Sequence, residues 1–361
     1  MSETNENFFI VQKNGDIHLN YKKYGISWRG DVHDLRLILD HTPLQLERIH
    51  NSRFYKYNIN NKDIWFEFDE LLYENEKVSL RWIRRNSSKY VLMKRLKHVN
   101  SSSLFQEAII HTIVFHCLEY FNLTKVVPRV YDIVKYDSET VFTMEAFPLS
   151  ITFSDYLVQN FAKLNTHCFI EVFAQIALYM LPLQRILFFN HRDLKSDNIL
   201  IEQTPVKHEI LFKGKKYIVH ASIRAILIDF GFGCIGVEHS GTPILNSGSV
   251  LPAIDPCPKD GRDIFHILTS LYSFNLFREN LNPGLKILFD KWLTVGEKSY
   301  KDGVIRNEND PEWIYSVTSG SFFSAPGCSP SAILDDIATH YPQIVKVEDS
   351  GPVTPSTPSS S

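Results

Sequence analysis

The chain has 361 residues, of which 44% are hydrophobic and 22% charged, and its formal net charge is −3. This composition is typical of a globular protein of about two domains, and it excludes a largely disordered, collagen-like or coiled-coil chain. Five cysteines are sparse over this length and odd in number, which indicates a reducing compartment and no disulfide scaffold. Because the net charge is close to zero, nucleic acid is not expected as a partner.

The ends and the apolar segments of the chain indicate its location. Residues 1–7 are polar and acidic and lack the basic end and apolar run of a secretion signal. The most apolar stretch, residues 168–189, is interrupted by charged and amide residues and by Pro182. It therefore predicts a core helix and not a membrane span. We expect a cytoplasmic protein with no membrane partner.

The first half of the chain predicts a small lobe. Residues 1–60 mix aromatic and polar residues without sustained periodicity, so we interpret them as an N-terminal extension of unclear structure. Residues 61–147 predict mostly antiparallel strands and one helix over 103–121, which three serines can cap. The predicted strands are short runs rich in β-forming residues: 64–68, 78–83, 90–93, 126–134 and 140–146.

The second half changes character. Residues 148–347 predict a larger, mainly helical lobe, because long helical patterns dominate there. Its segments, in order, are helices over 153–161 and 167–188, two strands within 199–230, and further helix from Asp263. Residues 348–361 are rich in Ser, Thr and Pro and predict a disordered tail.

Two motifs carry the chemical signal. Residues 191–198 read His-Arg-Asp-Leu-Lys-Ser-Asp-Asn and lie between a long predicted helix and a strand. Residues 229–231 read Asp-Phe-Gly and follow the apolar run 226–228. In sequence and in order, they resemble the catalytic loop and the metal-binding motif of protein kinases. The resemblance implies an α+β, bilobal kinase-like fold with ATP and Mg²⁺ bound between the lobes.

The resemblance also implies a role for each polar residue of these motifs. Asp193 would accept the proton of the substrate hydroxyl, and Lys195 would neutralise charge at the transferred phosphoryl group. Asn198 and Asp229 would hold Mg²⁺ on the phosphates, and their hard oxygen atoms suit that ion. Asp263 would be a buried residue that braces the catalytic loop.

Residues of the small lobe fit the same resemblance. Lys94 ends a Val-Leu-Met-Lys strand, and Glu107 on the next predicted helix would pair with it and aim its ammonium at the phosphates. Glu119 lies on that helix too, but near its end. Glu145 and Phe147 belong to a segment that resembles the linker whose backbone binds adenine, although an ordinary strand end is an open alternative.

Two departures from the family pattern bear on function. No glycine occurs between Gly30 and Gly214, so the Gly-rich loop that covers the phosphates is missing from the turn around 73–77. This absence favours a different lid or weak nucleotide binding. The Ala-Pro-Glu motif is also missing, with Ala-Ile-Asp-Pro at 253–256 in its place, which puts the docking of a peptide substrate in question.

Three further features complete the prediction. Residues 203–222 predict an extended β-hairpin, and this insertion resembles divergent kinase-like proteins of large DNA viruses, which would place the protein in the host cytoplasm or the virion. Cys234 is expected to be a small thiol of the core. Seven cations between Arg81 and Lys97, with no acid among them, could bind nucleic acid, but we interpret them as a solvated sheet face.

The expected function is transfer of the γ-phosphoryl group of ATP to a Ser or Thr hydroxyl of a protein substrate. Lys195, two residues after Asp193, favours Ser/Thr specificity within the resemblance. A pseudokinase that serves as a scaffold is the first alternative, because the Gly-rich loop is missing. A small-molecule kinase is the second, because the Ala-Pro-Glu motif is missing. The sequence leaves the oligomeric state open.

Overall fold

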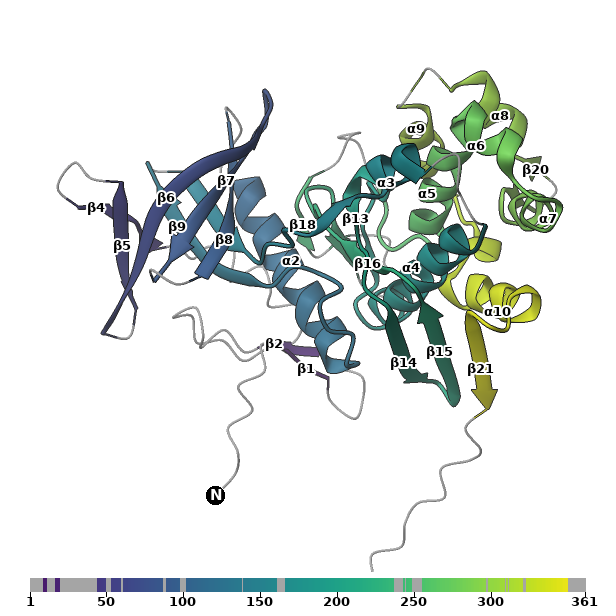
Figure 1. Ribbon diagram of the computed structural model, residues 1–361, viewed down its shortest axis with the longest axis horizontal. Coiled ribbons are helices and arrows are strands. Elements are labelled where there is room, and N and C mark those ends of the chain that lie inside the picture. The colour runs from purple at the N-terminus through teal and green to yellow at the C-terminus, as the bar shows by residue number, and fades with distance from the viewer. Residues whose placement is uncertain are drawn as a thin grey trace, which may run out of the picture.

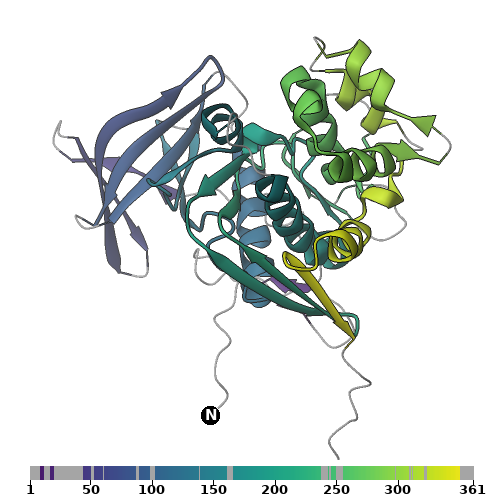
Figure 2. The same ribbon diagram turned by 45° about the vertical axis from the view of Figure 1, so that its right-hand side comes forward.

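Two lobes make up the protein, with a curled sheet on one side and most of the helices on the other (Figure 1). The computed structural model describes residues 9–11, 17–19, 44–49, 53–59, 61–86, 89–97, 102–137, 139–160, 166–236, 243, 245–248, 255–296, 298–308, 310, 312–320 and 323–349. The α+β, bilobal kinase-like fold expected from the sequence is therefore present. The turned view separates the sheet of the small lobe from the helices of the large lobe equally clearly (Figure 2).

An eight-stranded sheet dominates the small lobe, in the order β3-β9-β10-β8-β7-β6-β5-β4. Its strands are antiparallel except for the short β3–β9 pairing. Their bounds are β3 Leu44–Gln45, β4 Glu47–Arg48, β5 Phe54–Ile59, β6 Lys62–Glu74, β7 Val78–Arg85, β8 Lys89–Leu96, β9 Val130–Tyr136 and β10 Glu139–Met144. The predicted strand over 126–134 was wrong at its start, because Pro128 has no N–H to give to a ladder.

The two faces of this sheet have different partners, since side chains alternate along each strand. Val91 and Met93 of β8 point into an aromatic-rich cluster enclosed by the curl of the sheet. On the opposite face, Phe142 of β10 packs with Leu104 and Ala108 of helix α2 (Ser102–Tyr120). Lys94 lies on this second face, between the sheet and α2.

Part of the predicted N-terminal extension belongs to the same sheet. β5 pairs along its whole length with β6, from Phe54 opposite Glu67 to Ile59 opposite Lys62. The sheet therefore extends beyond the boundary at residue 61 that the sequence suggested. β1 (Phe9–Val11) and β2 (Ile17–Leu19) form a separate two-stranded ribbon.

Helix α4 (Thr166–Ile186) is the centre of the large lobe and packs against α10, α2 and β15. By length and composition Cys168–Ile186 could cross a membrane, but 89% of its apolar window is buried inside the protein, as the prediction of a core helix requires. The other helices are α3 Phe153–Asn160, α5 Arg262–Ser273, α6 Asn275–Asn280, α7 Pro283–Trp292, α8 Lys301–Arg306, α9 Trp313–Ser319 and α10 Pro330–His340.

The predicted hairpin insertion is confirmed. β14 (Val206–Phe212) and β15 (Lys215–Ala221) pair in register, and the two residues of the turn, Lys213 and Gly214, both have positive φ, as a tight hairpin requires. β21 (Val345–Asp349) adds a third strand to β15 (Figure 1). Residues 348 and 349 of the predicted tail thus lie in a sheet, and residues 350–361 lie outside the described residues.

The large lobe also contains short strands, several of which flank the motifs identified in the sequence. They are β11 Ser150–Thr152, β12 Phe189–Asn190, β13 Ile199–Glu202, β16 Arg224–Leu227, β17 Cys234–Ile235, β18 Leu245–Asn246, β19 Thr294–Val295 and β20 Lys298–Ser299. β11, β13 and β16 form one sheet, and β12, β17 and β18 form another. The catalytic-loop motif at 191–198 therefore lies between two strands, β12 and β13, each of which belongs to a sheet.

Candidate functional site

The Asp193 side chain is buried and held in place by its own loop. Its Oδ2 accepts a hydrogen bond from Asn198 Nδ2 at 3.0 Å and forms an ion pair with Lys195 Nζ at 3.1 Å. The same Asn198 amide also donates to the backbone carbonyl of Asp193 at 2.7 Å. The structure therefore brings together the three loop residues that the sequence singled out.

The buried Asp263 braces this loop through hydrogen bonds, as the sequence predicted. The carboxylate is fully buried, and it accepts one hydrogen bond from the Arg192 backbone amide at 2.8 Å and another from Asn190 Nδ2 at 2.9 Å. Arg192 has a φ of +65°, a left-handed conformation that is costly for a residue with a Cβ. The Asp263 carboxylate supplies the hydrogen bond that holds the backbone there.

A buried charge network continues from the Arg192 side chain. The guanidinium donates to the Asp255 carbonyl at 2.6 Å and to Asn246 Oδ1 at 3.0 Å. The Asp255 carboxylate accepts from Arg262 at 2.7 Å and lies 3.3 Å from Lys259 Nζ. Burial lowers the pKa of Arg192 to about 10, although Asp255 opposes this shift. Asp255 therefore ties the residues near the missing Ala-Pro-Glu position to the catalytic loop, a role that the sequence did not reveal.

Cys234 and Cys257 form a disulfide, so the prediction of a free core thiol at Cys234 was wrong. Both residues are fully buried. Cys234 lies in β17, which pairs with β12 just before the catalytic loop, and Cys257 lies two residues after Asp255. The two cysteines are 23 residues apart in sequence and of unremarkable spacing, which is why their pairing escaped prediction. The bond joins the two ends of the segment that follows the Asp-Phe-Gly motif.

Lys94 connects the two lobes through a pair of ion pairs. Its Nζ lies 2.6 Å from Glu107 Oε1 on α2 and 3.0 Å from Asp229 Oδ1 of the large lobe. The structure places Glu107 against Lys94, whereas Glu119 pairs with His116. Burial disfavours the charged Lys94, but the two carboxylates outweigh it and raise its pKa. The ammonium therefore stays charged at the junction of the two lobes.

The geometry of the strands brings Asn198 and Asp229 to the same edge. Ile199 of β13 lies opposite Leu227 of β16, and the Ile228 amide donates to the Asn198 carbonyl at 3.1 Å. The two side chains therefore leave adjacent strand ends. Burial favours a higher pKa for Asp229, but Lys94 and the Gly231 amide stabilise the carboxylate and lower its pKa to about 2.

The residues present fit a magnesium ion held on a nucleotide. Asp229 Oδ1 is occupied by Lys94 and the Gly231 amide, but no described residue donates a hydrogen bond to Asp229 Oδ2 or to Asn198 Oδ1. These are hard oxygen donors of the kind that Mg²⁺ prefers. Within the described part of the chain, no three His, Cys, Asp or Glu side chains converge on one point. Two protein ligands completed by phosphate oxygens are the usual arrangement for Mg²⁺.

The linker between the lobes has free backbone groups. Among the described residues, none forms a backbone hydrogen bond with the carbonyl of Glu145 or the amide of Phe147. A cavity of about 460 Å³ lies beside this linker, lined by Asp69, Glu70, Trp82, Tyr90, Ala146 and Pro148. Trp82 pairs with Leu92, two residues from Lys94 on the same face of the sheet. The cavity is therefore on the Lys94 side of the sheet, where an adenine would lie.

The turn between β6 and β7 stands where the Gly-rich loop is missing. Asn75 Oδ1 accepts hydrogen bonds from the amides of Lys77 and Val78, at 2.8 and 2.7 Å, and the Asn75 amide donates to the Val78 carbonyl at 2.9 Å. These three amides are satisfied within the turn. They are consequently not free to bind a phosphate, as backbone amides of a Gly-rich loop do.

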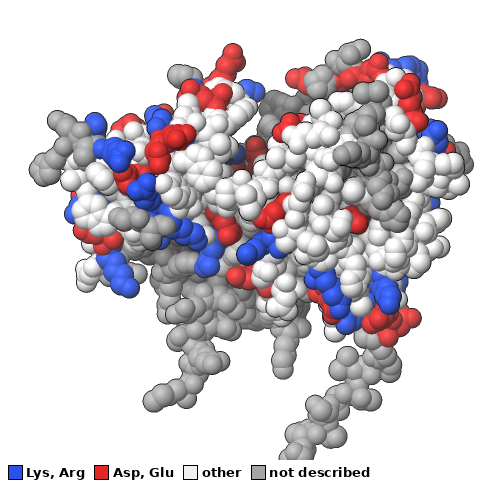
Figure 3. All heavy atoms as spheres, viewed as in Figure 1, with Lys and Arg blue, Asp and Glu red and all other residues white. Residues whose placement is uncertain are grey.

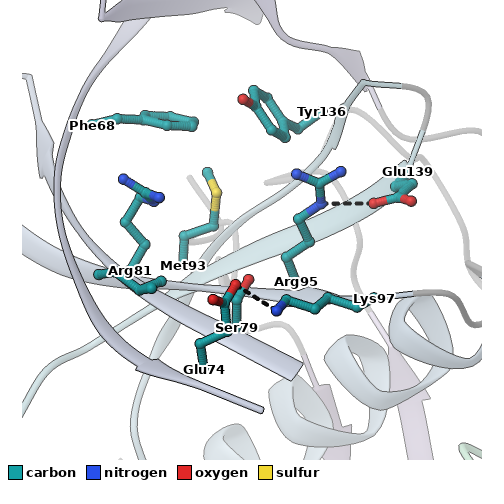
Figure 4. Close-up of a pocket in the computed structure, with 10 residues that line it drawn as sticks. Phe68, Glu74, Ser79, Arg81, Met93, Arg95, Lys97, Tyr136 and Glu139 are labelled. Carbon is teal, nitrogen blue, oxygen red and sulfur yellow. Dashed lines mark hydrogen bonds and ion pairs between the residues drawn. The ribbon is translucent and has the colours of Figure 1, made fainter. Parts of the chain in front are cut away.

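A second cavity, of about 490 Å³, opens on the other face of the sheet (Figure 4). Its carboxylates are already engaged, Glu74 with Lys97 at 2.6 Å and Glu139 with Arg95 at 2.7 Å. This cavity is separated from the Lys94 side by the sheet itself. Arg95 and Lys97 of the basic run are thus paired with acids from other strands, and Figure 3 shows the two charges interspersed over the small lobe.

One contact at the site had no signal in the sequence. The hydroxyl of Tyr315, on helix α9, donates a hydrogen bond to Asp193 Oδ1. Tyr315 is 122 positions from Asp193 and lies in a polar stretch without a motif. Only the packing of α9 against the large lobe could have identified it.

A comparison with protein families gives one match. The family model described as poxvirus serine/threonine protein kinase matches residues 69–247. No curated protein matches the sequence. The matched segment runs from β6 to just beyond β18 and includes Lys94, Glu107, Asp193 and Asp229, but it ends before α5 and α9.

Proposed function

Because this chain is a divergent protein kinase-like protein, similar to the serine/threonine kinases of poxviruses, we propose that it is an active ATP- and Mg²⁺-dependent protein kinase. In this proposal the γ-phosphoryl group is transferred to a Ser or Thr hydroxyl of a protein, in the host cytoplasm or the virion. No nucleic acid, membrane or particular oligomeric state is needed for the reaction.

Each residue of the site has a task in this reaction. Lys94 binds the phosphates, oriented by Glu107, and the free carbonyl of Glu145 and amide of Phe147 bind the adenine. Asn198 and Asp229 hold Mg²⁺, which neutralises charge on the phosphate oxygens when it is bound.

The transfer step follows from the position of Asp193. Its carboxylate accepts the proton of the substrate hydroxyl as the hydroxyl oxygen bonds to the γ-phosphorus. The bond from that phosphorus to the β–γ bridging oxygen breaks, and ADP leaves. Lys195, beside Asp193, stabilises the negative charge on the phosphoryl group during its transfer.

The double ion pair of Lys94 carries this proposal. A buried ammonium that is shared between Glu107 on α2 and Asp229 of the large lobe gives the fold no clear stability advantage over well-packed apolar side chains. It does place a positive charge on the Asp229 carboxylate, whose Oδ2 accepts no hydrogen bond from a described residue and which follows a strand end adjacent to that of Asn198. That combination suits a magnesium nucleotide and supports catalysis.

The test is a transfer assay with ATP labelled at the γ-phosphate, Mg²⁺ and generic protein substrates. We expect labelled phosphoserine or phosphothreonine with the wild type, and a loss of about a thousandfold in Asp193→Asn, within the usual range for a general base. Asp229→Asn should also lose transfer. Asp290→Asn is the matched control, because Asp290 is an exposed carboxylate whose one ion pair among the described residues is with Lys301 on the surface of the large lobe. Equal activity in all four proteins would refute the proposal.

A pseudokinase is the second candidate, and the closed Asn75 turn is the observation that favours it. A lid whose amides are already satisfied holds the phosphates less firmly than a Gly-rich loop. This candidate predicts stabilisation by magnesium ATP, about 2.7 kcal/mol at a hundredfold excess over Kd, without any transfer. Transfer to a small alcohol but to no protein would instead indicate a small-molecule kinase.

A further inference from the structure

The Asp193 carboxylate has three polar partners, and one of them comes from far away in the sequence. Asn198 donates a hydrogen bond to Oδ2 at 3.0 Å, Lys195 forms an ion pair with the same oxygen at 3.1 Å, and both belong to the catalytic loop. The hydroxyl of Tyr315 donates to Oδ1 from helix α9. Tyr315 therefore contacts the group that the proposed function assigns as the base.

Helix α9 is anchored to the core of the large lobe, so the position of Tyr315 is fixed. Thr318, one turn along the helix, is fully buried, and its Oγ1 lies 2.7 Å from His266 Nε2 on α5. Lys259 Nζ donates to the carbonyls of Thr318 and Gly320, at 2.5 and 3.0 Å. The Tyr315 ring packs edge-on against the His266 ring, with centroids 5.2 Å apart. The hydroxyl is thus held by the same lobe that carries Asp193.

The hydroxyl of Tyr315 takes up one of the hydrogen-bond acceptor positions of the Asp193 carboxylate. An ionised carboxylate offers about four lone-pair positions, two on each oxygen. On Oδ2, Asn198 occupies one of these positions and the Lys195 ammonium lies 3.1 Å away. On Oδ1, Tyr315 occupies one position, and the other is left for the proton of a substrate hydroxyl.

We propose that Tyr315 is a positioning residue, which fixes the Asp193 carboxylate so that the free lone pair of Oδ1 faces the acceptor hydroxyl. This inference rests on the proposed function, since it assigns Asp193 as the base. Burial and the neighbouring Asp193 carboxylate raise the pKa of Tyr315, against the effect of Arg262, so the hydroxyl keeps its proton and remains a donor. The other charged or titratable groups around this contact are Lys195 and His266.

A competing role is that Tyr315 occupies the place of the substrate hydroxyl and must move away before transfer. The anchoring of α9 argues against it. Withdrawal of the helix would expose the buried Thr318, remove the Thr318 partner of His266 and take two carbonyl acceptors from Lys259, which is costly inside a protein. Tyr315 is better explained as a permanent part of the site.

The test compares Tyr315→Phe with Tyr300→Phe. Tyr300 is a partly buried tyrosine of the same lobe whose hydroxyl has no hydrogen bond among the described residues, so its substitution controls for the loss of a hydroxyl. We expect kcat to fall about tenfold or more in Tyr315→Phe, because a hydrogen bond to a charged group is lost, and KM for ATP to stay within about twofold. Tyr300→Phe should match the wild type.

Two results would overturn the proposal. An unchanged or higher kcat in Tyr315→Phe, with a lower KM for the protein substrate, would show that Tyr315 competes with the substrate. Phosphotyrosine at position 315, detected by mass spectrometry after incubation with magnesium ATP, would show that it is an acceptor.

A spectroscopic readout separates this inference from the proposed function. The difference Raman spectrum of wild type minus Tyr315→Phe isolates the ring of Tyr315, and we expect the signature of a hydrogen-bond donor. In an Asp193→Ala background that signature should disappear. If the wild type transfers no phosphoryl group, the proposed function fails, and the spectrum alone tests whether Tyr315 positions Asp193. A donor signature supports this positioning, and the absence of the signature overturns it.

Discussion

The backbones of the catalytic loop and of the turn at Asn75 are held in place in opposite ways. Both hold polar backbone groups in a strained or tight conformation. The loop is fixed from outside by buried groups of distant elements, Asp263 and Asp255 among them. The turn is fixed by the side chain of its own Asn75, and its residues are exposed.

This difference shows where the chain has kept kinase-like features and where it has lost them. The large-lobe half of the site depends on a network in which each member needs the others, so a single change is costly. The lid half of the site is held by contacts within its own turn, so its sequence can vary without an effect on the core. A kinase-like protein can therefore lose its Gly-rich loop and still retain the loop that holds Asp193.

The largest effect on stability is expected from Asp263→Ala. It leaves the Arg192 amide buried without an acceptor and removes one of the two acceptors of Asn190 Nδ2, and we expect the free energy of unfolding to fall by about 3–4 kcal/mol. Urea unfolding measures it. Asp290→Asn serves as the surface control and should change stability by less than about 0.5 kcal/mol. Equal values for the two variants would mean that the loop is not braced from outside.

Loss of the disulfide should have the next largest effect. Reduction, or the double change Cys234→Ser with Cys257→Ser, is expected to lower the free energy of unfolding by about 3 kcal/mol, because the bond closes a loop of 23 residues. Thermal unfolding with and without a dithiol measures the difference. The same dithiol should leave the stability of the double variant unchanged, and an unchanged wild type would show that the two cysteines are not bonded.

The smallest effect is expected at the lid. Asn75→Gly removes the side chain that organises the turn, but the turn is exposed, so the free energy of unfolding should change by less than about 1 kcal/mol. The same denaturation assay measures it. A loss as large as that of Asp263→Ala would contradict the contrast between the two regions.

Local patterns were enough to predict the elements and the residues of the two motifs. Alternating strands, a capped helix and the hairpin turn depend on neighbours in the sequence, so the lobes and the insertion were predictable. The placement of Glu107 against Lys94 also follows from the order of a strand and the helix after it.

Contacts between distant segments that no motif marks were not predictable. Asp255, Tyr315 and the Cys234–Cys257 bond depend on how the chain after the Asp-Phe-Gly motif folds back onto the catalytic loop. No periodicity or spacing marks these residues. The start of β9 was placed too early because an apolar run was weighed more heavily than Pro128 within it.

Magnesium-dependent binding of ATP tests the central claim most directly, namely that Lys94, Asn198 and Asp229 form one nucleotide site between the lobes. Titration calorimetry of the wild type should show ATP binding that weakens when Mg²⁺ is removed with a chelator. The metal dependence should be lost in Asp229→Asn and retained in Asp290→Asn. ATP binding with the same affinity and the same metal dependence in Asp229→Asn, or no binding to the wild type, would contradict the account.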